Sequence, residues 1–179
     1  EWEEANEEVI FNSFDIERGN RLEPIARQEY EARTLIPVEE VGFIESDDGL
    51  LGYSPDGLVG EDGLIEIKAP RRSKHLETVF KNEVPLEHIA QIQGGLYLSN
   101  RKWLDFISYN ENCNILKISE GLVNNTNDYN HLKDKIKIDN TCIIRVYRDE
   151  EYIAKLQEAI IKYTNYFNIE LKNIKNKLK

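Results

Sequence analysis

The chain of 179 residues contains no methionine, only two cysteines and no apolar run as long as a membrane-spanning helix requires. A helix that crosses a bilayer needs roughly 20 consecutive apolar residues, so we expect no membrane partner. Because methionine is absent even from position 1, we expect the natural chain to begin upstream. We also expect no secretory signal. The isolated Cys113 and Cys142 could form one disulfide, but free thiols in a reducing cytoplasm are the simpler interpretation.

The composition fits one soluble globular domain. Hydrophobic residues make up 40% of the chain and charged residues 31%, which differs from both disordered and membrane proteins. The length is sufficient for a substantial core. The formal net charge of -10 counts against a general nucleic-acid binder, because such proteins are usually basic. It does not exclude an enzyme that holds metal ions with clustered carboxylates, for which we expect a basic strip on an acidic body.

The stretch 53–70, Y-S-P-D-G-L-V-G-E-D-G-L-I-E-I-K-A-P, predicts a hairpin with polar chemistry at one end. Three glycines and an acidic pair mark tight turns between two short apolar runs. Successive side chains of a strand point to opposite faces of a sheet. In the second run we therefore expect Ile65 and Ile67 to be buried, while Glu66 and Lys68 share a polar face.

Asp56 arrives near Glu66 if this hairpin folds back on itself. Two carboxylates and one ammonium at a strand end suit a divalent metal, because Mg²⁺ prefers carboxylate and carbonyl oxygens and keeps several waters. Such a metal polarises a phosphoryl oxygen and generates hydroxide, while Lys68 orients the nucleophile or stabilises developing charge. From spacing alone, the alternative is a solvated strand face with a Glu–Lys pair beside an acidic turn.

A basic cluster follows the hairpin at Arg71, Arg72 and Lys74. Lys and Arg side chains supply the sequence-independent part of DNA binding by contacting phosphates. These three residues are therefore candidates for phosphate contacts, and a solvated helix start is an equal alternative.

The segment 85–100 has apolar residues at helical spacing and predicts a helix. Gln93 lies within its apolar arc, and Gln91 lies on the opposite side together with His88. A buried glutamine has to be hydrogen-bonded, so each glutamine also has a purely structural interpretation. Gln91 is our candidate for a functional site and Gln93 is the second choice. We expect His88 on the helix surface rather than as a metal ligand.

The other segments predict further regular elements around the hairpin. A proline within the first predicted helix, Pro24, indicates a kink or a helix start near Glu23. The expected segments are an acidic arm at 1–17, a helix at 17–33, strands at 38–44, 103–109 and 142–147, a loop-rich insertion at 110–140 and a long helix from 149 onward.

Two parts of the hairpin resemble a known nuclease motif. Pro55-Asp56, followed after nine intervening residues by Glu66-x-Lys68, resembles the PD-(D/E)xK motif. The sequence S-P-D-G-L…G-L-I-E-I-K-A-P is similar to that of the viral-type recombinase nucleases, the YqaJ-like family typified by lambda exonuclease.

Two further matches occur in the right order along the chain. Ahead of the hairpin, Gly19 and Glu23 form a G-x-x-x-E pattern that resembles the family helix whose glutamate faces the metal site. After the hairpin, the sequence A-Q-I-Q begins its glutamine pair with Gln91, as in this family. The resemblance covers roughly residues 18–165.

The resemblance implies an α/β fold with a restriction-endonuclease-like core, in which helices flank a central mixed β-sheet. It also implies a single PD-(D/E)xK nuclease domain over residues 1–179. Asp56, Glu66 and the backbone carbonyl of Ile67 would hold Mg²⁺, with Mn²⁺ as a substitute. Glu23 would help to position a second metal or its waters.

In the family's reaction, Glu66, Lys68 and Gln91 would be catalytic, the last two by orienting the attacking water. The resemblance implies that the substrate is double-stranded DNA, digested 5′ to 3′ from an end in phage-type homologous recombination. It further implies a single-strand-annealing protein as partner, a homo-oligomer that is a trimer in the family, and the cytoplasm of a bacterial host.

One part of the chain departs from the family. These enzymes have an N-terminal segment with an arginine that reads the 5′-phosphate, and residues 1–17 do not match it. One alternative is a RecB-like or restriction-type endonuclease of the same superfamily. Another is a non-catalytic DNA-binding domain, against which the intact Asp56, Glu66 and Lys68 argue.

Overall fold

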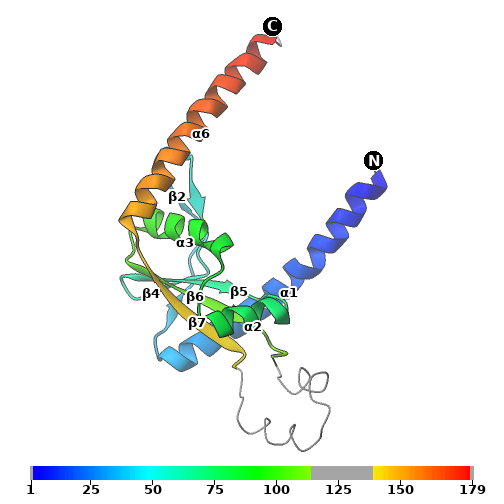
Figure 1. Cartoon of the computed structure of the whole chain (residues 1–179), viewed down its shortest axis with the longest axis vertical. Coiled ribbons are helices and arrows are strands. Elements are labelled where there is room, and N and C mark those ends of the chain that lie inside the picture. The colour runs from blue at the N-terminus through cyan, green and yellow to red at the C-terminus, as the bar shows by residue number, and fades with distance from the viewer. Residues whose placement is uncertain (1, 114–138, 178–179) are drawn as a thin grey trace, which may run out of the picture.

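The chain builds a mixed β-sheet with helices on both faces, as the computed structural model shows for residues 2–113 and 139–177, with side chains described from residue 15 onward (Figure 1). The main sheet has five strands in the order β1-β4-β5-β6-β7, and β2 pairs with β3 in a separate two-stranded sheet. β5 and β6 run parallel, and the other neighbours in the main sheet are antiparallel. The predicted α/β class with a central mixed sheet is confirmed.

The elements have the following bounds along the chain: α1 Trp2–Thr34, β1 Val38–Glu39, β2 Ile44–Glu45, β3 Gly52–Tyr53, β4 Gly57–Val59, β5 Gly63–Lys68, α2 Arg72–Lys81, α3 Leu86–Ser99, β6 Trp103–Tyr109, β7 Thr141–Tyr147 and α6 Glu150–Lys177. The two parallel strands β5 and β6 are joined through α2 and α3. Parallel neighbours require such a crossover, because a tight turn cannot return the chain to the same end of the sheet.

β4 and β5 form the predicted hairpin. Gly57 lies opposite Ile65 in the antiparallel register. The turn contains Gly60 at a φ of +56°, a conformation that glycine adopts without strain. Gly63 begins β5 against the ring of Trp103, and a Cβ there would lie 2.2 Å from that ring. Backbone freedom at the turn and close approach at Gly63 therefore explain why glycines punctuate this stretch.

Alternate residues of β5 belong to two hydrophobic cores, one on each face of the sheet. On one face, Ile65 and Ile67 pack with residues of α1. On the other face, Leu64 packs with Ile92 and Leu96 of α3. The predicted alternation along β5 is confirmed, and helices cover both faces.

α1 continues without a break through Pro24. Its contact with the sheet is a stripe at intervals of four residues, formed by Leu22, Ala26 and Tyr30, all nearly inaccessible to solvent. The predicted helix at 17–33 is confirmed and extends in both directions. α1 and α6 both project beyond the sheet as long arms (Figure 1).

The prediction of one strand over 38–44 is wrong. The chain instead forms β1 and β2, two residues each, in two different sheets. Residues 40–43, which include Gly42, separate the two strands, and the chain crosses from one sheet to the other there. The strands predicted at 103–109 and 142–147 and the helix predicted from 149 are confirmed as β6, β7 and α6. The insertion predicted at 110–140 lies mostly outside the described residues.

Two expectations from composition concern the described part of the chain. Over residues 2–113 and 139–177, no helix is both long enough and apolar enough to cross a bilayer. Cys113 and Cys142 are free thiols, as the simpler interpretation expected.

Candidate functional site

β5 carries Glu66 and Lys68 on the face of the sheet that α3 covers. The Glu66 side chain is 2% exposed and the Lys68 side chain is 33% exposed. The alternative of a solvated strand face is therefore wrong for Glu66, which is a buried polar group. The reason is the parallel pairing of β5 with β6, because the crossover through α2 and α3 places helices over this face.

Three donors converge on the buried Glu66 carboxylate. Lys68 Nζ lies 2.7 Å from Oε1, and Gln91 Nε2 donates to the same oxygen at 2.8 Å. The Tyr53 hydroxyl donates to Oε2 at 3.1 Å. A buried carboxylate is costly unless it is paired and hydrogen-bonded. These contacts satisfy Glu66 and hold it in one orientation.

Asp56 immediately precedes β4 and lies against the end of β5. Its Oδ2 accepts a hydrogen bond from the backbone N–H of Ile67 at 2.6 Å. The pKa of Asp56 is raised to about 7, mainly by burial and then by the negative charge of Glu66. Glu23 raises it further, while the hydrogen bond from Ile67 and the charge of Lys68 act in the opposite direction. Burial and neighbouring carboxylates therefore both favour the protonated form of Asp56 when no cation is bound.

Glu23 reaches this region from α1. Its Oε1 accepts a hydrogen bond from Arg27, one turn further along the helix, at 2.6 Å. The same guanidinium contacts Glu40 at 2.7 Å. Since the charge of Glu23 contributes to the raised pKa of Asp56, the two carboxylates sense each other. The structure thus brings α1 to the acidic end of the hairpin.

The donor set suits a hard divalent cation. Mg²⁺ is commonly held by one or two carboxylates, with water completing its shell. Among the residues that the structure describes, no group of three or more His, Cys, Asp or Glu side chains forms a ready metal cage. Asp56 and Glu66 nevertheless fit a cation of this kind, because both are oxygen donors and their negative charges lie close enough for Glu66 to raise the pKa of Asp56, after burial, the main cause. Ile67, whose N–H binds Asp56, lies next to Glu66 in β5.

The two glutamines of α3 have different environments. Gln91 extends toward the sheet and donates to Glu66. Gln93 is 3% exposed, donates to the carbonyl of Tyr147 and accepts from the N–H of Asp149, both at 2.9 Å. Gln93 therefore fixes the junction between β7 and α6 to α3. Of the two candidates, the structure brings only Gln91 to the acidic pair.

Two aromatic side chains near the site had not been singled out as part of it. Tyr53 is buried, and burial together with the charge of Glu66 raises the pKa of its hydroxyl. His88 is not a free surface residue: it stacks on Phe106 with ring centroids 5.3 Å apart. Burial and the nearby charge of Lys68 lower the pKa of His88. The only sequence signal for Tyr53 was its place three residues before Asp56.

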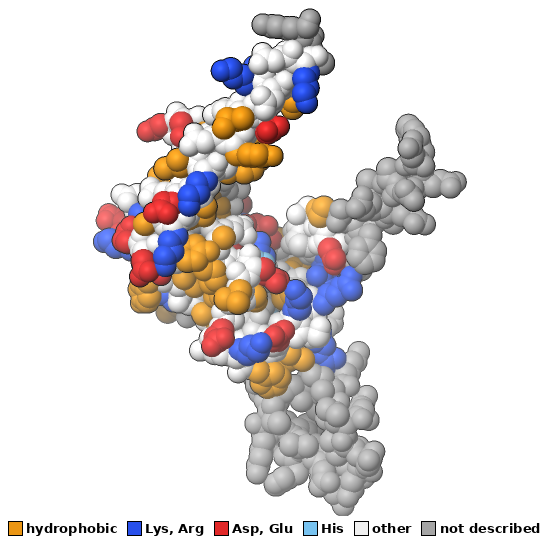
Figure 2. Space-filling view, turned by 45° about the horizontal axis from the view of Figure 1, so that its top comes forward, with side chains coloured by type: hydrophobic (Ala, Val, Ile, Leu, Met, Phe, Trp, Pro, Cys, Tyr) orange, Lys and Arg blue, Asp and Glu red, His pale blue; other side chains and the backbone are white. Residues whose placement is uncertain are grey.

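The predicted basic cluster lies beside the site at the start of α2. Lys74 forms an ion pair with Glu87 at 3.0 Å, and Arg71 lies 3.6 Å from Asp15 of α1. A pocket of about 370 Å³ adjoins this cluster, and both Lys68 and Lys74 line it. Figure 2 shows Lys and Arg side chains gathered in the middle of one face, between the two projecting helices. Lys68, which pairs with Glu66, therefore opens into the same hollow as Lys74, although Asp56 and Glu66 themselves do not line it.

A family model for the YqaJ-like viral recombinase domain matches residues 3–102. The match covers α1 from its second residue, strands β1 to β5, α2 and α3. It therefore contains all the acidic residues of the site together with Lys68 and Gln91.

Solved structures with the same architecture extend this likeness to most of the chain. The chain is similar to an alkaline exonuclease from Laribacter hongkongensis, with a TM-score of 0.72 and 32% identity, over 91% of this chain and 73% of that one. A structure of the same exonuclease in complex with dAMP gives the same values. A phage-related exonuclease from Haemophilus somnus 129PT has a TM-score of 0.62 over 89% and 73%, but at 16% identity it supports the fold alone. No protein with a curated description matches the chain.

Proposed function

Because the chain belongs to the family of YqaJ-like viral recombinase domains, we propose that it is a metal-dependent DNA exonuclease. The proposed substrate is the end of double-stranded DNA, digested in the 5′ to 3′ direction during phage-type recombination. The observation that carries the proposal is one cluster: Asp56 and Glu66, with Lys68 Nζ 2.7 Å from Glu66 and Gln91 Nε2 at 2.8 Å.

In the proposed reaction the acidic pair holds Mg²⁺, with Mn²⁺ as a substitute. Asp56, Glu66 and the backbone carbonyl of Ile67 are its proposed ligands, and Glu23 helps to hold a second ion or its waters. A divalent cation bound there would supply Lewis-acid activation of the phosphodiester and of a water. The geometry in support is the contact between Asp56 and Ile67, which ties the first acid to the strand of the second.

Lys68 and Gln91 have the proposed task of orienting the attacking water. Both reach Oε1 of Glu66, so their nitrogen atoms already converge on one point. Positioned donors at such a point act without reorganising during the reaction, which makes their contribution large. Tyr53 holds the other oxygen of Glu66 and so fixes the carboxylate on which both donors depend.

We propose that the DNA backbone follows the pocket lined by Lys68 and Lys74, with further phosphate contacts from Arg71 and Arg72, which follow Pro70 of its lining in the chain. Phosphates there would replace the acidic partners that Lys74 and Arg71 contact in this structure. The related exonuclease was crystallised with dAMP, a mononucleotide of the kind that stepwise digestion releases. That complex supports a nucleotide-sized product.

The first experiment follows 5′-labelled linear duplex and covalently closed circular duplex incubated with the protein in Mg²⁺. We expect release of mononucleotides from the linear DNA, no cutting of the circle and no reaction with a chelator. Linear duplexes with and without a 5′-phosphate, and with the label at either end, determine the direction of digestion and the need for the phosphate.

The outcomes separate the alternatives. Cutting of the circle would favour a restriction-type or RecB-like endonuclease. Binding of DNA without any cleavage in Mg²⁺ or Mn²⁺ would favour a non-catalytic DNA-binding domain. Digestion that continues fully in a chelator would contradict the metal-dependent mechanism.

The remaining proposals come from the family resemblance. A single-strand-annealing protein that takes up the product strand is the proposed partner, and the cytoplasm of a bacterial host is the proposed location. The homo-oligomer that the resemblance implies stays a prediction.

A further inference from the structure

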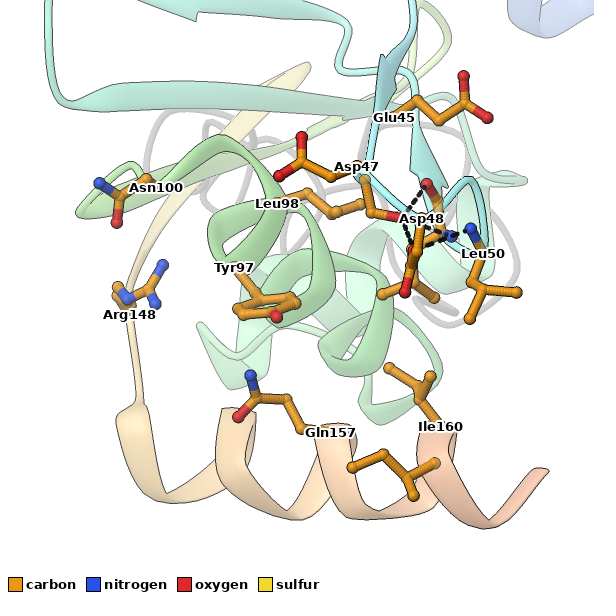
Figure 3. A pocket seen from close by; sticks show the side chains of 13 residues that line it. Glu45, Asp47, Asp48, Leu50, Tyr97, Leu98, Asn100, Arg148, Gln157 and Ile160 are labelled. Carbon is orange, nitrogen blue, oxygen red and sulfur yellow. Dashed lines mark hydrogen bonds between the residues drawn. The ribbon is translucent and has the colours of Figure 1, made fainter. Parts of the chain in front are cut away.

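α3 lines two pockets, one near each of its ends, and their charges differ. The pocket near its C-terminal end has a volume of about 580 Å³ and lies between α3, α6 and the β2–β3 hairpin (Figure 3). Its acidic lining residues are Glu45, Asp47 and Asp48. The pocket near its N-terminal end, which Lys68 and Lys74 line, is also lined by His88. Its two acids, Asp15 and Glu87, each lie within 4 Å of a basic side chain. Carboxylates disfavour a phosphate backbone in the first pocket, whereas the second offers it donors.

His88 is held beside the catalytic strand by its place in α3 and by a ring contact. It precedes Gln91 by three residues, a spacing that puts two side chains on the same face of a helix. From this face Gln91 donates to Glu66. The His88 ring stacks on the ring of Phe106, with centroids 5.3 Å apart and 29° between the planes. Phe106 is the neighbour of Glu66 in the parallel register of β5 and β6. The ring therefore has a fixed place next to the proposed catalytic cluster.

The ring nitrogens of His88 have no hydrogen-bond partner among the residues that the structure describes. Oε1 of Glu87 lies 3.9 Å from Nε2, which is beyond hydrogen-bond distance. His75 provides the contrast, because it is inaccessible to solvent and both of its ring nitrogens are bound. They contact the Ser108 hydroxyl at 2.9 Å and the Asp139 carbonyl at 3.1 Å. The His88 side chain is 22% exposed, so its N–H remains available to a ligand in the pocket.

Charged groups from three elements surround His88. Burial is the main cause that lowers its pKa, and the charges of Lys68 on β5 and Lys74 on α2 act in the same direction. Glu87 on α3 and Glu66 on β5 act in the opposite direction. Both lysines are therefore close enough to the ring to share one ligand with it. An imidazole has an N–H to donate whether it is neutral or protonated, so its capacity to bind a phosphate oxygen does not depend on this balance.

We propose that His88 donates its ring N–H to the internucleotide phosphate next to the scissile one, on the part of the cut strand that remains. This inference rests on the proposed nuclease function. Lys68 and Gln91 mark the reacting position, because both reach Glu66. His88 is displaced from Gln91 by three helical residues, or about 4.5 Å. This displacement is comparable with the rise of about 3.4 Å between successive phosphates of one DNA strand. His88 thereby fixes which phosphate reaches the acidic pair.

Two substitutions at the same position separate a phosphate contact from a packing role. His88→Phe keeps a flat ring to stack on Phe106 but has no N–H, whereas His88→Gln keeps an N–H donor and has no ring. His88→Phe should raise KM for linear duplex about tenfold at nearly unchanged kcat, and His88→Gln should stay within about threefold of the unmodified protein. Steady-state rates in Mg²⁺ measure both constants, with circular dichroism as the check of folding. Full activity of His88→Phe would mean that the ring only packs, and would overturn the proposal.

A modified duplex tests the contact directly and decides the case in which both variants lose affinity. In this duplex the phosphate next to the first scissile one is an uncharged methylphosphonate. The unmodified protein should bind it about tenfold more weakly than the natural duplex, whereas His88→Phe should distinguish the two by no more than about threefold, because its contact is already absent. Equal binding of the two duplexes by the unmodified protein, or the same loss in both proteins, would overturn the proposal.

Binding is measured by fluorescence anisotropy in a chelator, so the result does not depend on cleavage. A protein that binds the natural duplex but does not cut it in Mg²⁺ or Mn²⁺ would contradict the proposed nuclease function, and the two duplexes would still decide whether His88 contacts phosphate. Absence of DNA binding would overturn both proposals.

Discussion

Two neighbouring strands each bury one carboxylate, and the two carboxylates are satisfied in different ways. Asp105 of β6 receives two hydrogen bonds from Arg145, both at 2.8 Å, and a third from the hydroxyl of Tyr30 at 2.7 Å. The Arg145 guanidinium also lies 3.7 Å from the centre of the Trp103 ring. Glu66 of β5 likewise has three donors, but two of them are neutral, from Gln91 and Tyr53.

The difference lies in what surrounds each carboxylate. Asp105 has a bidentate arginine, the pairing that best matches a carboxylate, and it belongs to the face that α1 covers. Glu66 has one lysine, which is partly exposed, and a second acid, Asp56, whose pKa is raised mainly by burial and then by the charge of Glu66. The complete ion pair of Asp105 needs no further partner and stabilises the fold. The incomplete pairing of Glu66, next to a second acid, allows a cation to bind. The contacts of the two carboxylates therefore assign a structural role to Asp105 and a functional role to Glu66, independently of the fold family.

The largest expected effect is on catalysis. Lys68→Ala should lower the rate of Mg²⁺-dependent digestion by about 10³-fold, because it removes the only cation that contacts Glu66 among the described residues. The fold should persist, since Lys68 is partly exposed. The measurement is initial rates on labelled linear duplex, with circular dichroism as the check of folding.

Lys102→Ala is the matched control for that prediction. Lys102 pairs with Asp62 at 2.9 Å on the surface and is 73% exposed, so its loss should leave the rate unchanged. Full activity of the Lys68 variant would end the proposed mechanism.

The next effect is on stability and concerns the other carboxylate. Arg145→Ala should lower the free energy of unfolding by about 2–3 kcal/mol, because it leaves Asp105 buried with Tyr30 as its remaining partner. The rate per folded molecule should stay within about twofold of the unmodified protein, given that Arg145 does not contact the site. Urea unfolding and initial rates measure the two quantities, and an equal loss of both would abolish the distinction between the carboxylates.

The pH dependence of stability tests the comparison through the titration of Asp56. Its pKa in the folded protein, about 7, is above the ordinary value of 3.8. Asp56 therefore stabilises the folded state most at low pH, and this contribution is lost as the pH rises from about 4 through 7. In the presence of a chelator, the free energy of unfolding of the unmodified protein should fall over that pH range. This fall should exceed the fall in the Asp56→Asn variant by on the order of 1–3 kcal/mol.

Added Mg²⁺ should restore stability at high pH in the unmodified protein, because a ligand that binds only the folded state stabilises it. Asp56→Asn should show little gain. Equal pH dependence of the two proteins in the chelator would show that Asp56 titrates normally.

The smallest effects distinguish the two glutamines of α3. Gln91→Ala should lower the rate about tenfold with little change in stability, because its amide orients Glu66. Gln93→Ala should cost about 1–2 kcal/mol of stability and leave the rate of folded molecules unchanged, because it leaves Asp149 N–H and the Tyr147 carbonyl without their partner. The opposite pattern would mean that the wrong glutamine has been placed in the site.

The local chemistry of the site could be predicted from sequence because it is encoded locally. The glycines between Asp56 and Glu66 specify a hairpin, and period-two alternation assigns Ile65 and Ile67 to one face. The position of Gln91 followed from helical spacing together with the family pattern. Each of these signals acts over fewer than forty residues.

What covers each face could not be predicted in the same way. Alternation says that Glu66 and Ile67 point in opposite directions, but it does not say that α3 closes over Glu66. The hydroxyl of Tyr53 becomes a partner of Glu66 only through that packing, so no spacing rule reveals it. The strand expected over 38–44 failed for a related reason, since its two ends pair with different sheets. The length of α6 could be predicted from its sequence. Its projection beyond the sheet could not, because it depends on where α3 ends.

Asp56 and Ile67 lie close together along the chain, and this has a consequence for the order in which the molecule folds. Hairpins form in about 1–10 μs, and contacts across longer chain separations close later. We therefore expect the two acids to come together while the chain is still largely open, before α3 delivers the amide of Gln91 from 25 residues beyond Glu66. Later steps of folding would then close around two neighbouring carboxylates, and we expect a cation present at that moment to speed the final collapse.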